Sequence, residues 1–204
     1  MKRIYPKKLK GVKDMQYLDK ELLGAKRKLE HQKHVTLETG IYAGEELITF
    51  KQTCLFDDTV HLLLPEQFIV MPDSVKNVKY PSQEAPAFIM TSLDSIVNIG
   101  FNLIPEILKE KEIELMSVQF QNGLKNVNPS IIIKNQTNIK TEQGNEMSWF
   151  EYKGFHLDGQ SYNRVYLIRL GKNVLHGMFS CNVKDRDDWI EIIEKIFLSV
   201  EEEL

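Results

Sequence analysis

One stretch of the chain decides the fold, residues 147–183, which read MSWFEYKGFHLDGQSYNRVYLIRLGKNVLHGMFSCNV. Apolar and polar residues alternate along it, and the pair Asp158-Gly159 and residues 171–173 have the composition of tight hairpin turns. With the segment just before it, the stretch predicts four strands, at Ile131–Lys140, Met147–Leu157, Tyr162–Leu170 and Val174–Val183. Because the turns between them are short, we expect an antiparallel meander.

An amphipathic helix is predicted after the fourth strand. Its apolar positions recur every three or four residues, at Trp189, Ile192, Ile193, Ile196, Phe197 and Val200. The positive end of its dipole is complemented by three early aspartates, Asp185, Asp187 and Asp188. A second helix is predicted from Pro105 to about Asn126, because proline suits a first helical turn and an apolar face follows it.

Further strands are predicted in the front half of the domain. The two-residue period marks them at residues 47–56, 60–64, 87–90 and 97–103. The first two form a hairpin, because Asp57-Asp58 between them suits a turn. Residues 66–86 hold too many prolines for a helix or a central strand, so we expect a connection that crosses the surface.

Charge is distributed unevenly along the chain. Residues 1–34 hold eleven Lys or Arg against four acidic residues, a net charge of +7, which leaves −10 for the rest of a chain whose total is −3. We predict an extended arm at residues 1–17, then a basic amphipathic helix from Asp19 to about His34 with a stripe at Leu18, Leu22, Ala25 and Leu29. The chain is therefore divided into a basic arm and helix, residues 1–35, and a domain, residues 36–204.

Length and composition favour a globular protein that folds without disulfides or metals. The chain has 204 residues, of which 42% are hydrophobic and 27% are charged. The N-terminus lacks the apolar segment of a signal peptide, and no stretch approaches the roughly 20 apolar residues of a membrane-spanning helix. Cys54 and Cys181 lie far apart, as expected of free thiols in a reducing compartment. These features favour a cytoplasmic location.

The predicted elements describe an α+β domain, an antiparallel sheet with helices packed on it. Their order resembles the PsbP-like superfamily, an α/β/α sandwich that also includes a Ran-binding import factor and bacterial DcrB-like proteins. The resemblance is carried by the first hairpin running into Leu64-Pro65-Glu66-Gln67-Phe68, the strand at 97–103, and the strand-strand-helix ending at 162–200. It covers about residues 45–204 and implies the fold, but no ligand-binding residue. The basic segment before residue 45 departs from the exported members.

No catalytic or cofactor motif is found in the sequence. The chain lacks both glycine-rich nucleotide-binding patterns and a spacing typical of metal ligands. Cys181 and His176 are five residues apart on one predicted strand, so they face opposite sides, and we expect Cys181 to be a buried, inert thiol. For Cys54 the sequence indicates no histidine partner. Asp57, Asp58 and His61 flank the predicted turn, and the turn explains the two aspartates without a metal. We therefore expect no metal, no cofactor and, on balance, no enzymatic activity.

What remains is recognition by surface residues. Basic and aromatic side chains gather in the N-terminal helix and the meander, so the candidate partner-binding residues are Lys26, Arg27, Lys28, Trp149, Tyr152, Tyr162 and Arg164. Most of the rings are expected in the core, because a sheet covered by helices needs bulky residues on both faces.

We expect a non-enzymatic binding or assembly module. Its basic arm docks on the acidic C-terminal helix of its own or a second subunit, or binds another protein, and the acidic body argues against nucleic acid. The alternative is a small-ligand-binding protein or an enzyme, with a pocket between the sheet and residues 66–86.

Overall fold

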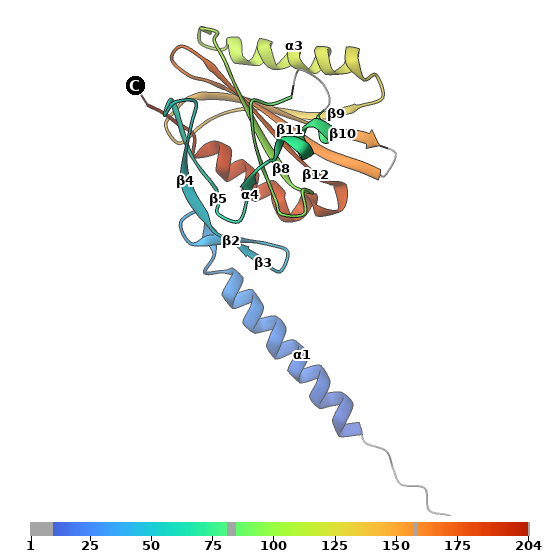
Figure 1. The fold of residues 1–204 in the computed structure, drawn as a ribbon. Coiled ribbons are helices and arrows are strands. Elements are labelled where there is room, and N and C mark those ends of the chain that lie inside the picture. The colour runs from blue at the N-terminus through green and yellow to red at the C-terminus, as the bar shows by residue number, and fades with distance from the viewer. Residues whose placement is uncertain (1–9, 81–84, 157–158, 204) are drawn as a thin grey trace, which may run out of the picture.

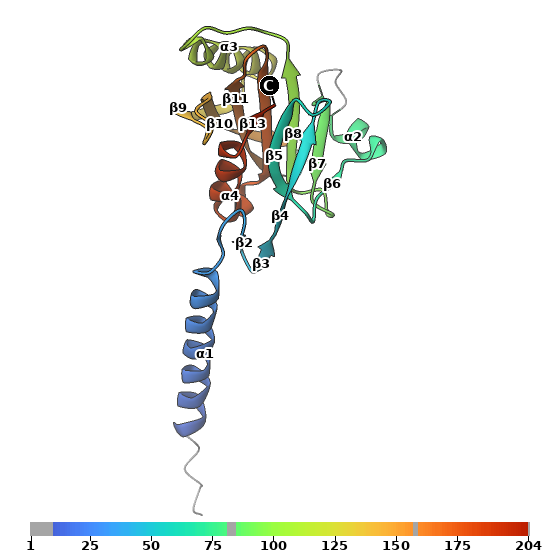
Figure 2. The same cartoon turned by 90° about the vertical axis from the view of Figure 1, so that its left-hand side faces the viewer.

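The computed structural model describes residues 10–80, 85–156 and 159–203. A seven-stranded antiparallel sheet lies at its centre, with the strands in the order β6-β7-β8-β12-β11-β10-β9 (Figures 1 and 2). The strands are β6 Ile69–Val70, β7 Phe88–Thr91, β8 Asn98–Ile104, β9 Ile132–Lys140, β10 Glu146–His156, β11 Gly159–Arg169 and β12 Val174–Asn182. The last four are neighbours in chain order, which confirms the predicted meander.

The closing helix and the first hairpin cover one face of this sheet. α4 (Arg186–Leu198) lies on it beside β4 (Phe50–Leu55) and β5 (Val60–Pro65), which pair as the predicted hairpin. The short β13 (Glu201–Glu202) pairs with the other edge of β5. The buried side chains of α4 are those expected from the sequence, Trp189, Ile192, Ile193, Ile196 and Phe197. They belong to the larger of the two apolar clusters in the described part of the chain.

A third helix, α3 (Glu112–Val127), lies on the other face of the sheet (Figure 1). Its Ile113 and Met116 pack against two side chains of the sheet, Leu167 and Val174. Helices therefore lie on both faces of one antiparallel sheet, and the predicted α+β sandwich is confirmed.

The start of α3 was predicted too early. Residues 105–111 are not helical, and the helix begins at Glu112, directly after a left-handed residue, Lys111, with φ of 68°. The backbone N–H of Lys111 donates to the carboxylate of Glu146 (3.1 Å to Oε2), and that of Lys109 donates to Glu112 Oε2 (2.7 Å). A contact with β10 thus fixes the turn that precedes the helix, and the local sequence does not reveal it.

The proline-rich connection also contains more structure than predicted. A short helix, α2 (Asp73–Lys79), lies within residues 66–86, where we expected no helix. Pro72 occupies its N-cap, ahead of the first turn, where a missing N–H breaks no helical hydrogen bond. Residues 81–84 lie outside the described residues.

The N-terminal helix is longer than predicted, and it projects from the sandwich (Figures 1 and 2). α1 spans Lys10–His31, so residues 10–17 are helical rather than extended, and they contain no proline to stop a helix. Residues 1–9, the start of the predicted arm, lie outside the described residues. A small sheet joins α1 to the sandwich, made of β1 Val35–Thr36, β2 Gly40–Ala43 and β3 Glu46–Ile48. The proposed boundary between residues 35 and 36 falls inside β1 and stays a prediction.

Candidate functional site

The C-terminal end of α1 is fastened to the small sheet by ring and ionic contacts. The His31 ring stacks on Tyr42, with centroids 3.9 Å and planes 7° apart, and the His34 ring meets Tyr42 at 5.6 Å with its plane at 80°. Arg27 Nη1 lies 2.9 Å from Glu45 Oε1. These contacts hold one side of the last turns of α1 toward the domain.

The opposite side of α1 is apolar and exposed. At about 3.6 residues per turn, Leu22, Ala25 and Leu29 lie on the side away from Arg27 and His31. The side chains of Leu22 and Leu29 are 60% and 61% exposed. Three predicted partner-binding residues are also exposed on this helix, Lys26, Arg27 and Lys28. Among the described residues of the basic segment, the expected docking on α4 of its own chain is not seen, because α1 leads away from α4 (Figure 2).

An acidic hollow lies beside the start of α4 and the small sheet. Its volume is about 490 Å³, and its lining includes two exposed apolar side chains, Leu93 (78% exposed) and Ile96 (36% exposed), besides buried ones such as Trp189. One cation, Lys184, lines it together with four acids, Glu46, Asp94, Asp185 and Asp188. The acidic hollow therefore combines apolar contact area with a charge opposite to that of α1.

Three of the four candidate binding residues in the meander are buried under α4. Trp149, Tyr162 and Arg164 are 8%, 2% and 4% exposed. The alternation of β10 and β11 turns them toward the covered face, as we expected for most of the rings. Tyr152 points to the opposite face, where it lines a groove. The expectation of partner contacts is therefore corrected for the first three, and Tyr152 stays a candidate.

Arg164 lies at the centre of a buried polar network. Its guanidinium carbon is 3.8 Å from the centroid of the Trp149 ring, and its Nη1 is 3.3 Å from Glu194 Oε2. Glu151 accepts a hydrogen bond from the Tyr162 hydroxyl (2.6 Å), and its Oε2 is 3.7 Å from Arg164 Nη2. Burial alone would raise the pKa of Glu151, but its hydrogen bonds and the nearby guanidinium charges hold that pKa below its ordinary value. These side chains therefore hold the fold together rather than face a partner.

An open groove of about 780 Å³ lies on the α3 side of the sheet. The ends of α2 and α3 and residues 94–96 wall it, and small polar side chains of the sheet form its base, among them Asn98, Asn163 and Ser180. The alternative prediction placed a ligand pocket here, between the sheet and residues 66–86. Tyr80 also lines the groove, and burial raises its pKa to about 12, so its hydroxyl stays protonated at neutral pH.

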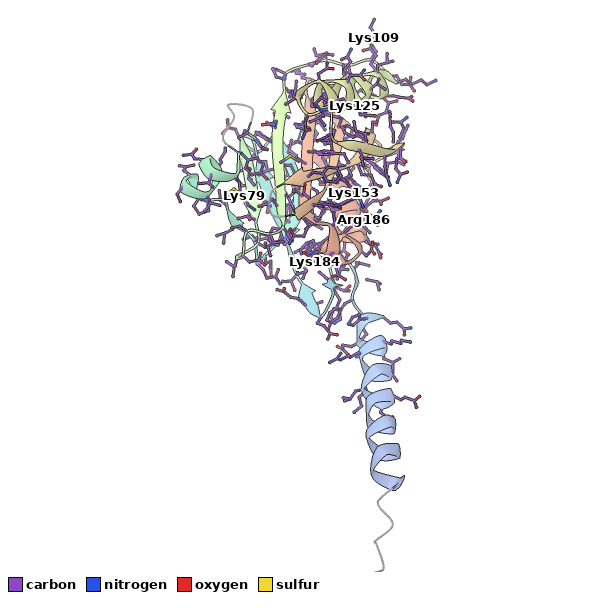
Figure 3. All side chains as sticks on the ribbon, turned by 90° about the vertical axis from the view of Figure 1, so that its right-hand side faces the viewer. Lys79, Lys109, Lys125, Lys153, Lys184 and Arg186 are labelled. Carbon is purple, nitrogen blue, oxygen red and sulfur yellow. The ribbon has the colours of Figure 1, made fainter. Side chains whose placement is uncertain are left out.

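Charged side chains line the groove and the hollow next to it. Lys79 lines the groove together with one acid, Asp94, and an adjoining hollow of about 320 Å³, which shares Tyr152 with it, is lined by Lys134, Lys153, Arg186 and one acid, Glu151. Figure 3, seen from the right-hand side of Figure 1, labels Lys79, Lys153 and Arg186 together with Lys109, Lys125 and Lys184. The adjoining hollow therefore carries a net positive charge, with three cations against one acid, whereas the lining of the groove itself holds one of each.

The structure pairs Cys54 with a histidine, contrary to the prediction that it has no such partner. Cys54 and His61 face each other across the β4–β5 hairpin, and Cys54 Sγ lies 3.3 Å from His61 Nδ1. The hairpin register could have revealed the pair, because both residues are equally far from the Asp57-Asp58 turn.

Cys181 is buried, as predicted. It is 2% exposed, and burial raises the pKa of its thiol to about 12. His176 faces the other side of β12, where it lies 3.2 Å from Asn102 Nδ2 through Nδ1 and against the ring of Phe120. Burial lowers the pKa of His176 to about 4. The two residues do not form a nucleophile and base pair.

The part of the chain that the structure describes contains neither a metal-binding cluster nor a membrane-spanning helix. There, no three or more His, Cys, Asp or Glu side chains are arranged to hold a metal ion. No helix within the same residues combines the length and the apolar character needed to cross a membrane.

Several solved structures are similar to this chain, at low sequence identity. Cyanobacterial PsbP (CyanoP) from Synechocystis sp. PCC 6803 is 12% identical, with a TM-score of 0.54, over 78% of this chain and 96% of that one. The Ran-binding protein Mog1p from Saccharomyces cerevisiae is 10% identical, with a TM-score of 0.51, over 76% and 95%. LpqN from Mycobacterium tuberculosis, involved in cell envelope biogenesis, is 12% identical, with a TM-score of 0.50, over 75% and 90%.

No family model and no curated protein matches the sequence. At identities of 10 to 12% the likeness shows the fold alone, and it extends over about three quarters of the chain. The chain therefore has the PsbP-like fold, the α/β/α sandwich that its sequence resembles.

Proposed function

We propose that this protein is a non-enzymatic binding or assembly module, and that α1 carries the contact with its protein partner. The proposal rests on the exposed stripe of α1, where Leu22 and Leu29 are 60% and 61% exposed on a helix that projects from the domain. Burial of a leucine side chain stabilises a complex by about 1.5–3 kcal/mol, and helices gain most of their stability from packing an apolar face. A partner that covers the stripe therefore stabilises α1 as it binds.

The charge of α1 favours an acidic partner surface. The acidic hollow of a second copy offers such a surface, because its lining combines Asp185 and Asp188 with the exposed apolar side chains Leu93 and Ile96. Protein binding has a precedent on this fold, since Mog1p is described as Ran-binding. A cytoplasmic location is part of the proposal, in keeping with two free thiols, and the acidic domain disfavours nucleic acid.

Leu22→Asp combined with Leu29→Asp is expected to abolish the association. In size-exclusion chromatography with light scattering, the full chain should form a concentration-dependent complex that weakens with added salt. The double variant should stay monomeric, because each aspartate would place a charge in the apolar contact. At concentrations low enough for both proteins to be monomeric, its thermal unfolding should match that of the full chain, since neither leucine packs on the domain.

Glu21→Ala is the matched control, an exposed change on the same helix outside the stripe, and it should leave the complex intact. If the full chain is itself monomeric, capture from a lysate with the full chain and the double variant side by side decides between partners. A partner captured only by the full chain supports the role of α1. The role of α1 would be contradicted if the full chain and the double variant had the same molar mass in solution and captured the same proteins.

The groove favours a second candidate function, the binding of a small anionic ligand. The observation behind it is the cavity of about 780 Å³ with Lys79 at its wall and three more cations at the adjoining hollow. Pockets for small ligands commonly have volumes of about 300–1,000 Å³ and a few placed polar groups.

Ser180→Trp and Lys79→Glu are expected to weaken binding of an anionic aromatic dye, anilinonaphthalene sulfonate, by at least about fivefold. The first change fills the base of the groove, and the second reverses the charge at its wall. Dye fluorescence measures the affinity, and Leu22→Asp with Leu29→Asp serves as the control for dye bound to α1. Unchanged affinity in both groove variants would exclude this candidate.

A further inference from the structure

Cys54, His61 and Glu203 form a chain of side-chain contacts on the β4–β5 hairpin. Cys54 Sγ lies 3.3 Å from His61 Nδ1, and His61 Nε2 lies 2.7 Å from Glu203 Oε2. Glu203 reaches the hairpin because β13 pairs with β5 and the Glu203 backbone N–H donates to the carbonyl of Thr59 (3.1 Å). Glu203, which is 142 residues from His61 in the sequence, is thus brought into line with the two hairpin residues.

The partners of His61 determine which of its nitrogens carries the proton. Nε2 faces two acceptors, the carboxylate of Glu203 and the backbone carbonyl of Asp58 at 2.9 Å, so Nε2 must be the donor. In the neutral ring Nδ1 is then unprotonated, and its lone pair faces the Cys54 thiol. This is the arrangement of a nucleophile, a general base and a group that orients the base.

The surrounding charges make the thiol depend on that base. Desolvation raises the pKa of Cys54, and the carboxylates of Asp58 and Glu203 raise it further. The hydrogen bond to Glu203 raises the pKa of His61, as do the contacts with Asp58. At neutral pH Cys54 is therefore mainly a thiol, and attack on an electrophile requires transfer of its proton to His61.

Cys54 and the other cysteine of the chain, Cys181, differ in solvent exposure. Cys54 is exposed on β4, which is an edge strand of its three-stranded sheet, whereas Cys181 is buried in the core. Cys54 does not line the groove or either of the hollows described above. An open position with a base suits a small electrophile rather than a large substrate that needs a shaped pocket.

We propose that Cys54 is a site of thiol-disulfide exchange, at which His61 acts as the general base and Glu203 orients it. Cys54 Sγ attacks one sulfur of a low-molecular-weight disulfide while its proton passes to His61 Nδ1. The S–S bond of the small molecule breaks and the leaving sulfur departs as a thiolate, while the proton on His61 passes to that thiolate or, where the released thiol is acidic, to water. The products are a mixed disulfide on Cys54 and one free small thiol, with no other oxidant consumed. This modification goes beyond the binding role proposed above and does not depend on it.

The test uses the full native chain and dithiobis(nitrobenzoate), an aromatic disulfide that releases a coloured thiolate. One thiol per chain is expected to react fast without denaturant, and Cys181→Ser should leave that phase unchanged. Cys54→Ser should remove it. His61→Gln, which cannot accept the proton, should slow it by at least about tenfold and remove the rise of the rate through the pKa of the imidazole.

Two milder variants test the same site if His61→Gln fails to fold. Glu203→Gln should lower the pKa of His61, so the rise of the rate with pH should shift to lower pH. Asp58→Asn keeps the backbone carbonyl and removes one carboxylate beside the thiol, so the rate at a fixed neutral pH should increase. Thermal unfolding of each variant shows that the fold is kept. A fast phase that survives in Cys54→Ser, or an unchanged pH profile in both His61→Gln and Glu203→Gln, would overturn the proposal.

Discussion

Gly177→Ala is expected to lower the free energy of unfolding by about 3 kcal/mol. Gly177 lies on β12 under α4, and a Cβ atom there would meet the ring of Phe197 at 2.0 Å from Cε1 and 2.4 Å from Cζ. The ring cannot move aside easily, because it stacks on Tyr166 with centroids 3.9 Å apart and meets Phe101 at 5.8 Å. In a chain of this size the loss corresponds to a fall of about 6 to 12 °C in Tm.

Gly123→Ala is the matched control in a thermal unfolding experiment. Gly123 lies within α3, and a Cβ atom there would meet nothing within 4 Å. The same substitution should therefore stabilise the protein by about 0.5–1 kcal/mol, because alanine is the better helix former. The double variant Gly177→Ala with Phe197→Leu should be less destabilised than the sum of its two changes, since leucine leaves room for the new methyl group. Equal Tm values for Gly177→Ala and the unchanged chain would show that the contact is not tight.

The meander and α4 could be predicted because their signals are local. Two-residue alternation marks each strand, Asp158-Gly159 marks a turn, and the spacing from Trp189 to Val200 marks the helix. The start of α3 could not, because it depends on a bond between Lys111 and a carboxylate on β10.

The contacts that give the candidate sites their chemistry are long-range as well. Glu203 reaches His61 from 142 residues away, so no local pattern could join them. The sequence can place Arg164 on a strand. Its burial, however, depends on which face of the sheet α4 covers and on the polar partners that Arg164 meets on that face. The pairing of Cys54 with His61 is the exception, because the hairpin register predicted from the turn already contains it.

Arg164→Met is expected to destabilise the protein by about 3 kcal/mol, because it leaves the carboxylate of Glu151 buried with less charge to balance it. Arg164 and Glu151 are 4% and 5% exposed, and the guanidinium also stacks on Trp149. The same substitution at Arg169, on the same strand, is the control. Its pair with Glu146 (2.8 Å) is 33% and 15% exposed, so it should lose at most about 1 kcal/mol.

The pH dependence of this loss identifies its cause. The pKa of Glu151 is held below its usual 4.5, so the stability that this carboxylate contributes is present above that pH and is lost as pH falls through the lower folded value. Arg164→Met removes one of the charges that lower this pKa, so the variant should lose less stability on acidification than the unchanged chain. Chemical unfolding at pH 7 and near pH 4 should therefore show a gap between the two proteins that narrows in acid. Two results would contradict this explanation. One is a difference in unfolding free energy that stays constant with pH, and the other is a double variant, Glu151→Gln with Arg164→Met, that is no more stable than Arg164→Met alone. Either result would mean that Arg164 acts through packing on Trp149 rather than through its charge.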